Sequence, residues 1–99
     1  MNKILDIEIE KDIVELAKRY NLEEVILFGS RADGTAHEKS DIDIAVKGYH
    51  SDNERFEFEE EVWKIPTLLM FDVVDLDSNM IDESLRKDIA EKGIILWKR

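Results

Sequence analysis

Short apolar segments alternate with longer amphipathic segments along this chain, and the alternation predicts an α/β (α+β) fold, a small sheet of about four strands flanked by helices. The chain has 99 residues, 43% of them hydrophobic, so it can bury one modest core. No internal repeat and no Gly-, Ser- or Pro-rich stretch divides it. We therefore expect a single domain over residues 1–99, in the order helix, strand, loop, strand, helix, strand, helix, strand.

Three segments have apolar residues at helical spacing. The expected helices cover residues 7–20, 52–65 and 79–92. The apolar faces consist of Ile9, Ile13, Leu16, Ala17 and Tyr20, then Phe58, Val62 and Ile65, then Ile81, Leu85 and Ile89. Asn21 is a reasonable stop for the first helix, Pro66 breaks the chain after the second, and Gly93 suits the C-terminal cap of the third.

Four other segments have the pattern of strands. They cover residues 25–28, 41–47, 68–76 and 94–97. The first is wholly apolar and ends at Gly29, which is typical of a buried strand followed by a turn. The second alternates between two faces, one with Ile42, Ile44 and Val46, the other with Asp41, Asp43 and Ala45. The polar stretch between these two strands predicts a loop that a helical turn after Ser30 can begin.

The charge of the chain limits its partners. Asp and Glu number 24 against 14 Lys and Arg, which gives a formal charge of −10. Because nucleic acids are bound largely through cationic side chains, we expect no free DNA or RNA partner. A metal-neutralised nucleotide and a basic protein remain candidates. The charge alone favours a simpler interpretation, which is that it keeps the protein in solution.

The chain has no cysteine, so a disulfide scaffold, a thiolate zinc site and a cysteine nucleophile are excluded. With many carboxylates available, oxygen-preferring cations such as Mg²⁺ are the expected metals. No apolar run approaches the roughly 20 residues of a membrane-spanning helix. The acidic N-terminus does not resemble a targeting peptide. We therefore expect no membrane partner and a cytoplasmic location.

Two aspartates in the second predicted strand are candidate metal ligands. Asp41 and Asp43 are two positions apart, so both side chains leave the same face with Cα atoms about 6.5–7 Å apart. Like charges held there repel unless a cation lies between them or water solvates them. Since Asp is disfavoured in strands, the pair predicts a divalent-metal site. A solvent-facing edge of the strand is the alternative.

A third carboxylate, Asp72, shares a predicted strand face with Leu68, Met70 and Val74. A carboxylate on a largely apolar face is unusual, and burying it unpaired would cost several kcal/mol. A metal shared with Asp41 and Asp43 would remove that cost. A frayed strand end would also explain the residue.

Gly29-Ser30 follows the first predicted strand. Gly29 lets the backbone turn tightly and approach a ligand closely. If a helical turn begins at Ser30, its N–H groups favour an anion such as phosphate. Such pairs also mark ordinary turns, so this pair gains weight only from the residues that follow it.

Gly29-Ser30, ten further residues and then Asp41-Ile42-Asp43 form the pattern G-S-x10-D-x-D. The chain therefore resembles the DNA polymerase β-like nucleotidyltransferases, most closely the minimal nucleotidyltransferases (MNT) encoded beside HEPN-domain proteins. The residues that also fit are Arg31, Gly34, Ser40, Asp72 and the segment 91–97, so the resemblance covers nearly the whole chain. Many members have a second arginine where this chain has Asp33, and the resemblance does not extend to a phosphate contact there.

The resemblance implies the polymerase β-like nucleotidyltransferase fold, a small mixed sheet flanked by helices. In this family Gly29, Ser30, Arg31 and Ser40 would bind the nucleotide. Asp41 and Asp43 would bind two Mg²⁺ ions. Asp72 would complete one metal site and help to deprotonate the attacking hydroxyl. ATP would be the substrate.

By the same resemblance, the chain would transfer AMP to a tyrosine of a partner HEPN toxin and act as a type VII antitoxin in a hetero-oligomer. Two alternatives are open. A non-catalytic nucleotide-binding module would neutralise its partner by masking it. A third interpretation is transfer to a small molecule, as in antibiotic-modifying relatives, but those carry a helical acceptor domain for which this chain has no room. The three intact aspartates favour the enzyme.

The remaining polar and aromatic candidates favour structural roles. His37 and His50 are expected to be exposed loop residues, with a phosphate contact as the alternative for His37. The acidic run 52–61 is typical of a solvated helix face, with a docking patch for a basic partner as the alternative. Trp63 and Trp97 are expected to pack in the core or at its edge, or to anchor a partner.

Overall fold

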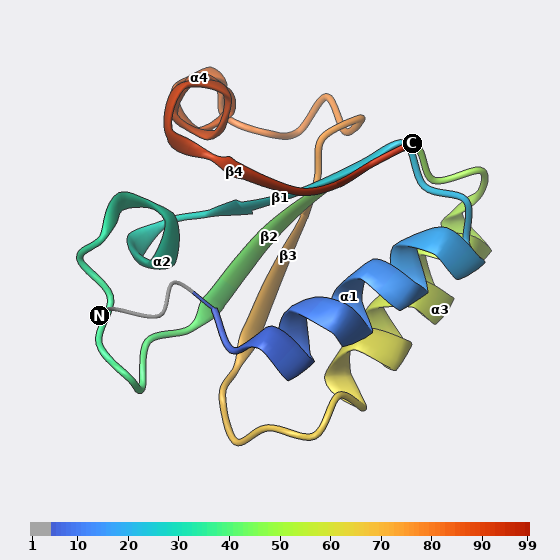
Figure 1. The fold of residues 1–99 in the computed structure, drawn as a ribbon. Coiled ribbons are helices and arrows are strands. Elements are labelled where there is room, and N and C mark those ends of the chain that lie inside the picture. Colours follow the sequence, from blue (N-terminus) through green and yellow to red (C-terminus); the bar gives the residue numbers. More distant parts are fainter. Residues whose placement is uncertain (1–4) are drawn as a thin grey trace.

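The chain forms a mixed sheet with the strand order β3-β2-β1-β4, packed between helices (Figure 1). The computed structural model describes residues 5–99, and within them lie four strands and four helices. The strands are β1 (Glu24–Phe28), β2 (Ile42–Lys47), β3 (Phe71–Asp75) and β4 (Ile94–Lys98). The helices are α1 (Ile7–Arg19), α2 (Ser30–Asp33), α3 (Asp52–Trp63) and α4 (Glu83–Lys92). The predicted fold class and element order are confirmed.

The pairing directions follow from how the strands are connected. β1 pairs antiparallel with both β2 and β4, while β2 and β3 are parallel because α3 carries the chain back between them. The register places Phe28 opposite Asp43, and Asp43 opposite Asp72. The end of β1 and the beginnings of β2 and β3 therefore meet at one edge of the sheet.

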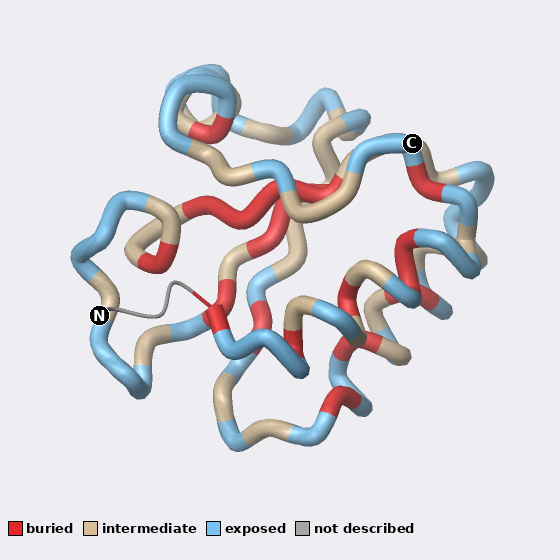
Figure 2. Tube along the Cα trace, in the orientation of Figure 1, coloured by how far each residue is buried: buried red, intermediate tan, exposed pale blue. Residues whose placement is uncertain are grey.

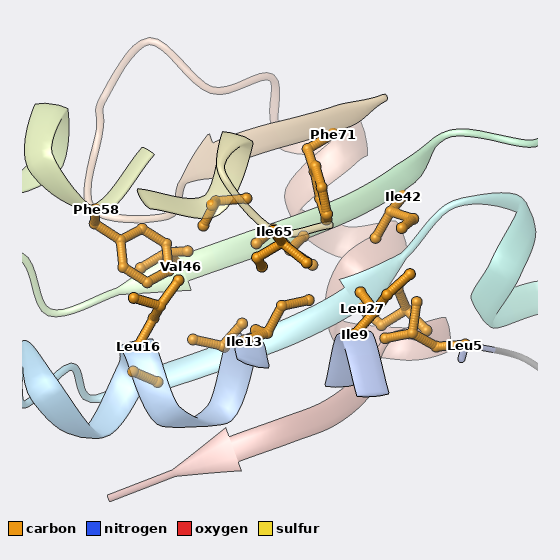
Figure 3. Packing of buried hydrophobic residues seen from close by; sticks show 14 of the residues in the cluster. Leu5, Ile9, Ile13, Leu16, Leu27, Ile42, Val46, Phe58, Ile65 and Phe71 are labelled. Atoms are coloured by element: carbon orange, nitrogen blue, oxygen red, sulfur yellow. The ribbon is translucent and has the colours of Figure 1, made fainter. Parts of the chain in front are cut away.

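Helices cover both faces of the sheet. α1 and α3 lie on one face and α4 lies on the other (Figure 1). The larger core cluster packs α1 and α3 onto side chains such as Leu27, Ile44 and Val46 (Figures 2 and 3). A smaller cluster on the opposite face joins Ile89 of α4 to Ala45. No helix within residues 5–99 is both long enough and apolar enough to cross a membrane.

Side-chain caps fix where the three long helices begin. Asp6 accepts a hydrogen bond from the Glu8 N–H, and Ser51 accepts one from the Glu54 N–H. Asp82 caps α4 in the same way, which places the beginning of that helix at Glu83 rather than at the predicted residue 79. Residues 79–82 form the turn that leads into the cap.

Two further differences from the sequence prediction have clear causes. β3 begins at Phe71 rather than at residue 68, because residues 67–70 form bends and irregular backbone before the pairing with β2 begins. Gly93 does cap α4, but in an extended conformation (φ −67°, ψ 153°) rather than a left-handed one. A Cβ at Gly93 would overlap the Ile89 carbonyl and the Ile26 side chain, so glycine permits close packing of α4 on β1.

Candidate functional site

The predicted site residues come from three neighbouring strands and from the turn after β1. Gly29 follows the last residue of β1, Asp43 is the second residue of β2, and Asp72 is the second residue of β3. Because β1 runs opposite to β2 and β3, these positions meet at the same edge of the sheet. Asp41 lies one residue before β2 and is exposed.

Gly29 and Asp43 are in close contact. Gly29 has φ 75° and ψ −153°, a region of backbone conformation that is essentially restricted to glycine. A Cβ there would overlap the Oδ2 atom of Asp43 and lie 3.1 Å from its Cγ atom. Glycine is thus required twice, once for the turn into α2 and once for the room that the Asp43 carboxylate occupies.

The Asp43 carboxylate lies in an unfavourable electrostatic environment. Partial burial raises the pKa of Asp43 above its ordinary value, and the nearby charges of Asp72 and Asp41 raise it further. The guanidinium of Arg31 lowers the same pKa by a smaller amount. A cation between these carboxylates would relieve their repulsion and lower the pKa of Asp43.

The environment of Asp72 differs from the one that its sequence neighbours suggested. Asp72 is exposed, and Leu68 and Met70 precede β3 with their side chains largely in solvent. Water therefore solvates the Asp72 carboxylate, and the expected cost of burying it does not arise. What remains is its direct pairing with Asp43 across the parallel ladder.

Arg31 is the buried charged residue among the described residues, with 7% of its surface exposed. Its guanidinium donates hydrogen bonds to three carbonyl groups of the segment before β2. The acceptors are the carbonyl oxygens of Ser40 (2.7 Å from Nη2), Asp41 (3.3 Å from Nε) and Glu38 (3.3 Å from Nη2). Arg31 therefore holds in place the segment that carries Asp41. The local sequence pattern gave no sign of this role.

Ser40 and Ser30 also take part in fixing this loop. The Ser40 hydroxyl accepts a hydrogen bond from the His37 N–H (3.0 Å). The Ser30 carbonyl accepts from the N–H groups of Thr35 (3.1 Å) and Ala36 (3.0 Å). Both serines are half-buried. The chain between β1 and β2 is thus tied down by local hydrogen bonds on both sides of its exposed tip.

The two histidines and Trp97 lie where their expected structural roles require, and Trp63 differs. His37 is exposed, and exposed His50 lies 2.8 Å from the carboxylate of Glu54 through its Nδ1 atom. Trp97 packs against the core, and its indole N–H donates to the Leu22 carbonyl (3.1 Å). Trp63 is 48% exposed.

The acidic residues of α3 and Asp33 also lie at the surface. Of the six acidic residues of α3, three are exposed, three are half-buried and none is buried, as expected for a solvated helix face. Asp33 accepts hydrogen bonds from the Thr35 hydroxyl (2.6 Å) and N–H (3.0 Å), and these bonds lower its pKa. Asp33 therefore stabilises the turn that follows α2.

The oxygen donors at this edge of the sheet match the chemistry of Mg²⁺. Within residues 5–99, no three acidic, His or Cys side chains are close enough together to hold an ion as they stand. Mg²⁺ commonly takes one or two protein carboxylates and completes its shell with substrate phosphate oxygens and water. Asp43 and its two neighbouring aspartates can supply that smaller number of ligands.

Comparisons with known proteins point to one family. The family described as polymerase beta, nucleotidyltransferase matches residues 11–99. A solved toxin–antitoxin structure with AMP-PNP contains a similar chain, 30% identical with a TM-score of 0.71, over 91% of this chain and 73% of that one. A mutant of the toxin–antitoxin pair MntA-HpeT is 28% identical, with a TM-score of 0.70 and the same two coverages.

A third solved structure contains the tri-AMPylated HEPN toxin of Shewanella oneidensis in complex with an MNT antitoxin. It is 25% identical to this chain, with a TM-score of 0.62, over 92% of this chain and 71% of that one. No curated protein sequence matches the chain.

Proposed function

The chain belongs to the polymerase beta nucleotidyltransferase family, and from this we propose that it transfers AMP from ATP to a hydroxyl group of a partner protein. The observation that carries the proposal is the line of Gly29, Asp43 and Asp72 across three adjacent strands. Glycine gives the Asp43 carboxylate its room, and the two aspartates are paired across the ladder. The solved relative that contains AMP-PNP supports ATP as the nucleotide.

We assign the nucleotide to the turn after β1. Gly29 and Ser30 contact the phosphates, because the backbone there turns without a side chain at Gly29 and can be approached closely. Ser40 borders the same site from the segment before β2. Arg31 supports nucleotide binding by holding the carbonyls of Ser40 and Asp41 in place.

In the proposed reaction, the acceptor hydroxyl oxygen attacks the α-phosphorus of ATP. A new bond forms between that oxygen and phosphorus, and the bond from the α-phosphorus to the bridging oxygen of the β-phosphate breaks. Pyrophosphate leaves with that electron pair, and the hydroxyl proton passes to the Asp72 carboxylate. The product is a phosphodiester that joins AMP to the partner.

Asp41, Asp43 and Asp72 would hold Mg²⁺, with two ions expected. When bound, divalent cations stabilise both the attacking and the leaving oxygen of an in-line displacement. The carboxylates themselves contribute fixed negative charge at this edge of the sheet. Among the charged groups that shift the pKa of Asp43, Arg31 is the one that lowers it. Because ATP is the proposed substrate, we propose a cytoplasmic location.

We propose a HEPN-domain toxin as the acceptor, a tyrosine as the modified residue, and the role of a type VII antitoxin for this chain. The relative that forms a complex with a tri-AMPylated HEPN toxin supports this partner and a hetero-oligomer. The alternative is a module that neutralises the same toxin by masking it, without transfer.

The mass of the partner separates these two functions. The HEPN-domain protein is incubated with this chain, ATP and Mg²⁺, separated from it, and then weighed intact and assayed for RNA cleavage. Transfer raises the mass by whole AMP units, and neutralisation persists after separation. The Asp43→Asn chain is the matched control and adds no mass. An unchanged mass with full recovery of RNA cleavage after separation contradicts transfer and supports masking.

A further inference from the structure

Three exposed apolar side chains lie at the beginning of the edge strand β3, and we name Trp63, Leu68 and Met70 together the β3 rim. Leu68 is fully exposed, Met70 is 57% exposed and Trp63 is 48% exposed. The Trp63 ring packs edge-on against the buried Phe71 ring, with centroids 6.1 Å apart. Grouped apolar exposure beside a polar site is typical of an interaction surface.

The β3 rim is held in a fixed position. Its neighbour in the chain, Leu69, packs against the core, and the Leu69 N–H donates to the Thr67 hydroxyl (3.1 Å). The Met70 carbonyl accepts a hydrogen bond from the Ile42 N–H (2.9 Å), which fastens the segment to the beginning of β2. A surface that is ordered before binding loses less conformational entropy when a partner docks.

The β3 rim lies on the side from which an acceptor must arrive. In an in-line displacement, the attacking oxygen and the leaving group lie on opposite sides of the phosphorus. If Gly29-Ser30 hold the phosphates, the hydroxyl approaches from beyond Asp72, at the other end of the site. Met70 precedes Asp72 by two residues, about 6.6 Å along an extended chain, so the rim borders that approach.

The charges around the β3 rim indicate the nature of the docked surface. Asp41 and Asp72 are exposed beside it. On the Trp63 side, exposed Glu60 is paired with exposed Lys64 (3.7 Å), so the two aspartates supply the uncompensated charge near the rim. The chain as a whole has a formal charge of −10. A complementary surface combines apolar side chains with basic ones, whereas a phosphate backbone would be repelled.

We propose that the β3 rim docks a protein whose basic surface contains apolar side chains, and that this protein thereby presents the acceptor hydroxyl to Asp72. The inference rests on the proposed function, because that function places the acceptor beyond Asp72. The inference assigns acceptor selection to the β3 rim, whereas ATP binding belongs to other residues.

The test compares substitutions in the β3 rim with a matched substitution elsewhere. Leu68→Ser and Met70→Ser remove rim side chains that carry little of the core. Met80→Ser is the control, since Met80 is 89% exposed in the segment after the other end of β3. Each chain is assayed for the Kd of AMP-PNP with Mg²⁺, the Kd of the HEPN-domain partner, and kcat/KM for AMP transfer to it.

The rim substitutions are expected to weaken partner binding and lower kcat/KM roughly 10-fold or more, as for central interface residues. They leave AMP-PNP affinity within about twofold of wild type, and Met80→Ser leaves all three values unchanged. The affinity for the partner also falls as salt is added.

Three results overturn the inference. The first is that the rim variants bind and modify the partner as wild type does. The second is that they lose AMP-PNP affinity as much as partner affinity. The third is that sedimentation shows a loss of self-association while partner binding is unchanged. If the wild-type chain adds no AMP to the partner, the proposed function fails instead. In that case the Kd between the partner and each rim variant still tests whether the β3 rim is a docking surface.

Discussion

Asp43 and Asp72 are direct partners in the parallel ladder between β2 and β3, so two carboxylates of the same charge lie opposite one another. Such cross-strand pairs of like charge destabilise a sheet. The arrangement is therefore unfavourable for folding in the absence of a cation. Residues that oppose stability in this way are often retained because function requires them.

Replacing Asp43 with Asn should stabilise the metal-free fold and remove activity. Relief of the repulsion contributes about 0.2–1 kcal/mol, which raises Tm by roughly 1–8 °C in a domain of this size. Transfer of AMP falls by at least about 100-fold because a carboxylate ligand is lost. Calorimetry in EDTA and then in Mg²⁺ measures the two Tm values, and the partner's mass measures transfer. We expect Mg²⁺ to raise Tm in the wild type only. Asp52→Asn, at the beginning of α3, is the control and keeps full activity. A fall in Tm for Asp43→Asn would indicate a structural role for that carboxylate.

The stability of the metal-free protein should depend on pH through Asp43. Its pKa is raised above the ordinary value of 3.8, so the folded protein binds a proton more readily than the unfolded chain. The resulting stability is fully present below pH 3.8 and is lost as pH rises through the folded pKa. Urea unfolding of wild type and Asp43→Asn in EDTA should show this loss in the wild type alone.

The Asp72 charge should contribute to the raised pKa of Asp43. In Asp72→Asn this charge is absent, and the pKa of Asp43 falls toward its ordinary value. A carboxyl ¹³C NMR titration of the metal-free protein measures the change. An Asp43 pKa that does not move would show that burial alone sets it.

Gly29→Ala should damage both the fold and the site. The backbone conformation at Gly29 costs about 1–3 kcal/mol for a residue with a side chain, and the added methyl group displaces the Asp43 carboxylate. Gly34→Ala is the matched control, because Gly34 also has a positive φ (86°) but a Cβ there would meet no atom within 4 Å. We expect both variants to lose stability and only Gly29→Ala to lose transfer. Equal activities would remove the Gly29–Asp43 contact from the mechanism.

Arg31→Lys should loosen the segment before β2. The planar guanidinium donates to three carbonyl oxygens, and an ammonium group cannot reproduce that geometry. Hydrogen bonds from a charged donor contribute about 1.5–3 kcal/mol each, so we expect a loss of roughly 2–4 kcal/mol. Hydrogen exchange should speed up in residues 35–41 and remain unchanged in α4. Unchanged exchange in residues 35–41 would mean that the loop does not depend on Arg31.

The elements of this fold were predictable because their signals are local. The apolar faces of α1 and α3, the buried run of β1 and the alternation of β2 all come from neighbouring residues. The strand order was not predictable in this way, because periodicity does not say which strand a segment will pair with. The pairing of Asp43 with Asp72 depends on that order, so the sequence could place both aspartates in strands but not opposite each other.

Three side chains have surroundings that a short sequence window does not reveal. Leu68 and Met70 look like strand residues because they are apolar, yet both lie exposed before β3. Arg31 follows Gly29-Ser30 in the sequence, but only the folded chain shows that its guanidinium is buried among backbone carbonyls nine or ten residues further along. Burial depends on which distant segments pack together, and that information is absent from a short window of sequence.

The pairing of β1 with β4 joins the first strand of the sheet to the last, and this sets an order of events during synthesis. At about 5–20 residues per second, the ribosome takes roughly 4–14 s to make the stretch of about 70 residues that separates Val25 from its partner Trp97. Throughout that interval one side of β1 is an open edge, which another chain could pair with. The strands that bring Gly29, Asp43 and Asp72 together are complete by Asp75. The part of the sheet that carries Gly29, Asp43 and Asp72 can therefore assemble on the nascent chain before β4 pairs with β1.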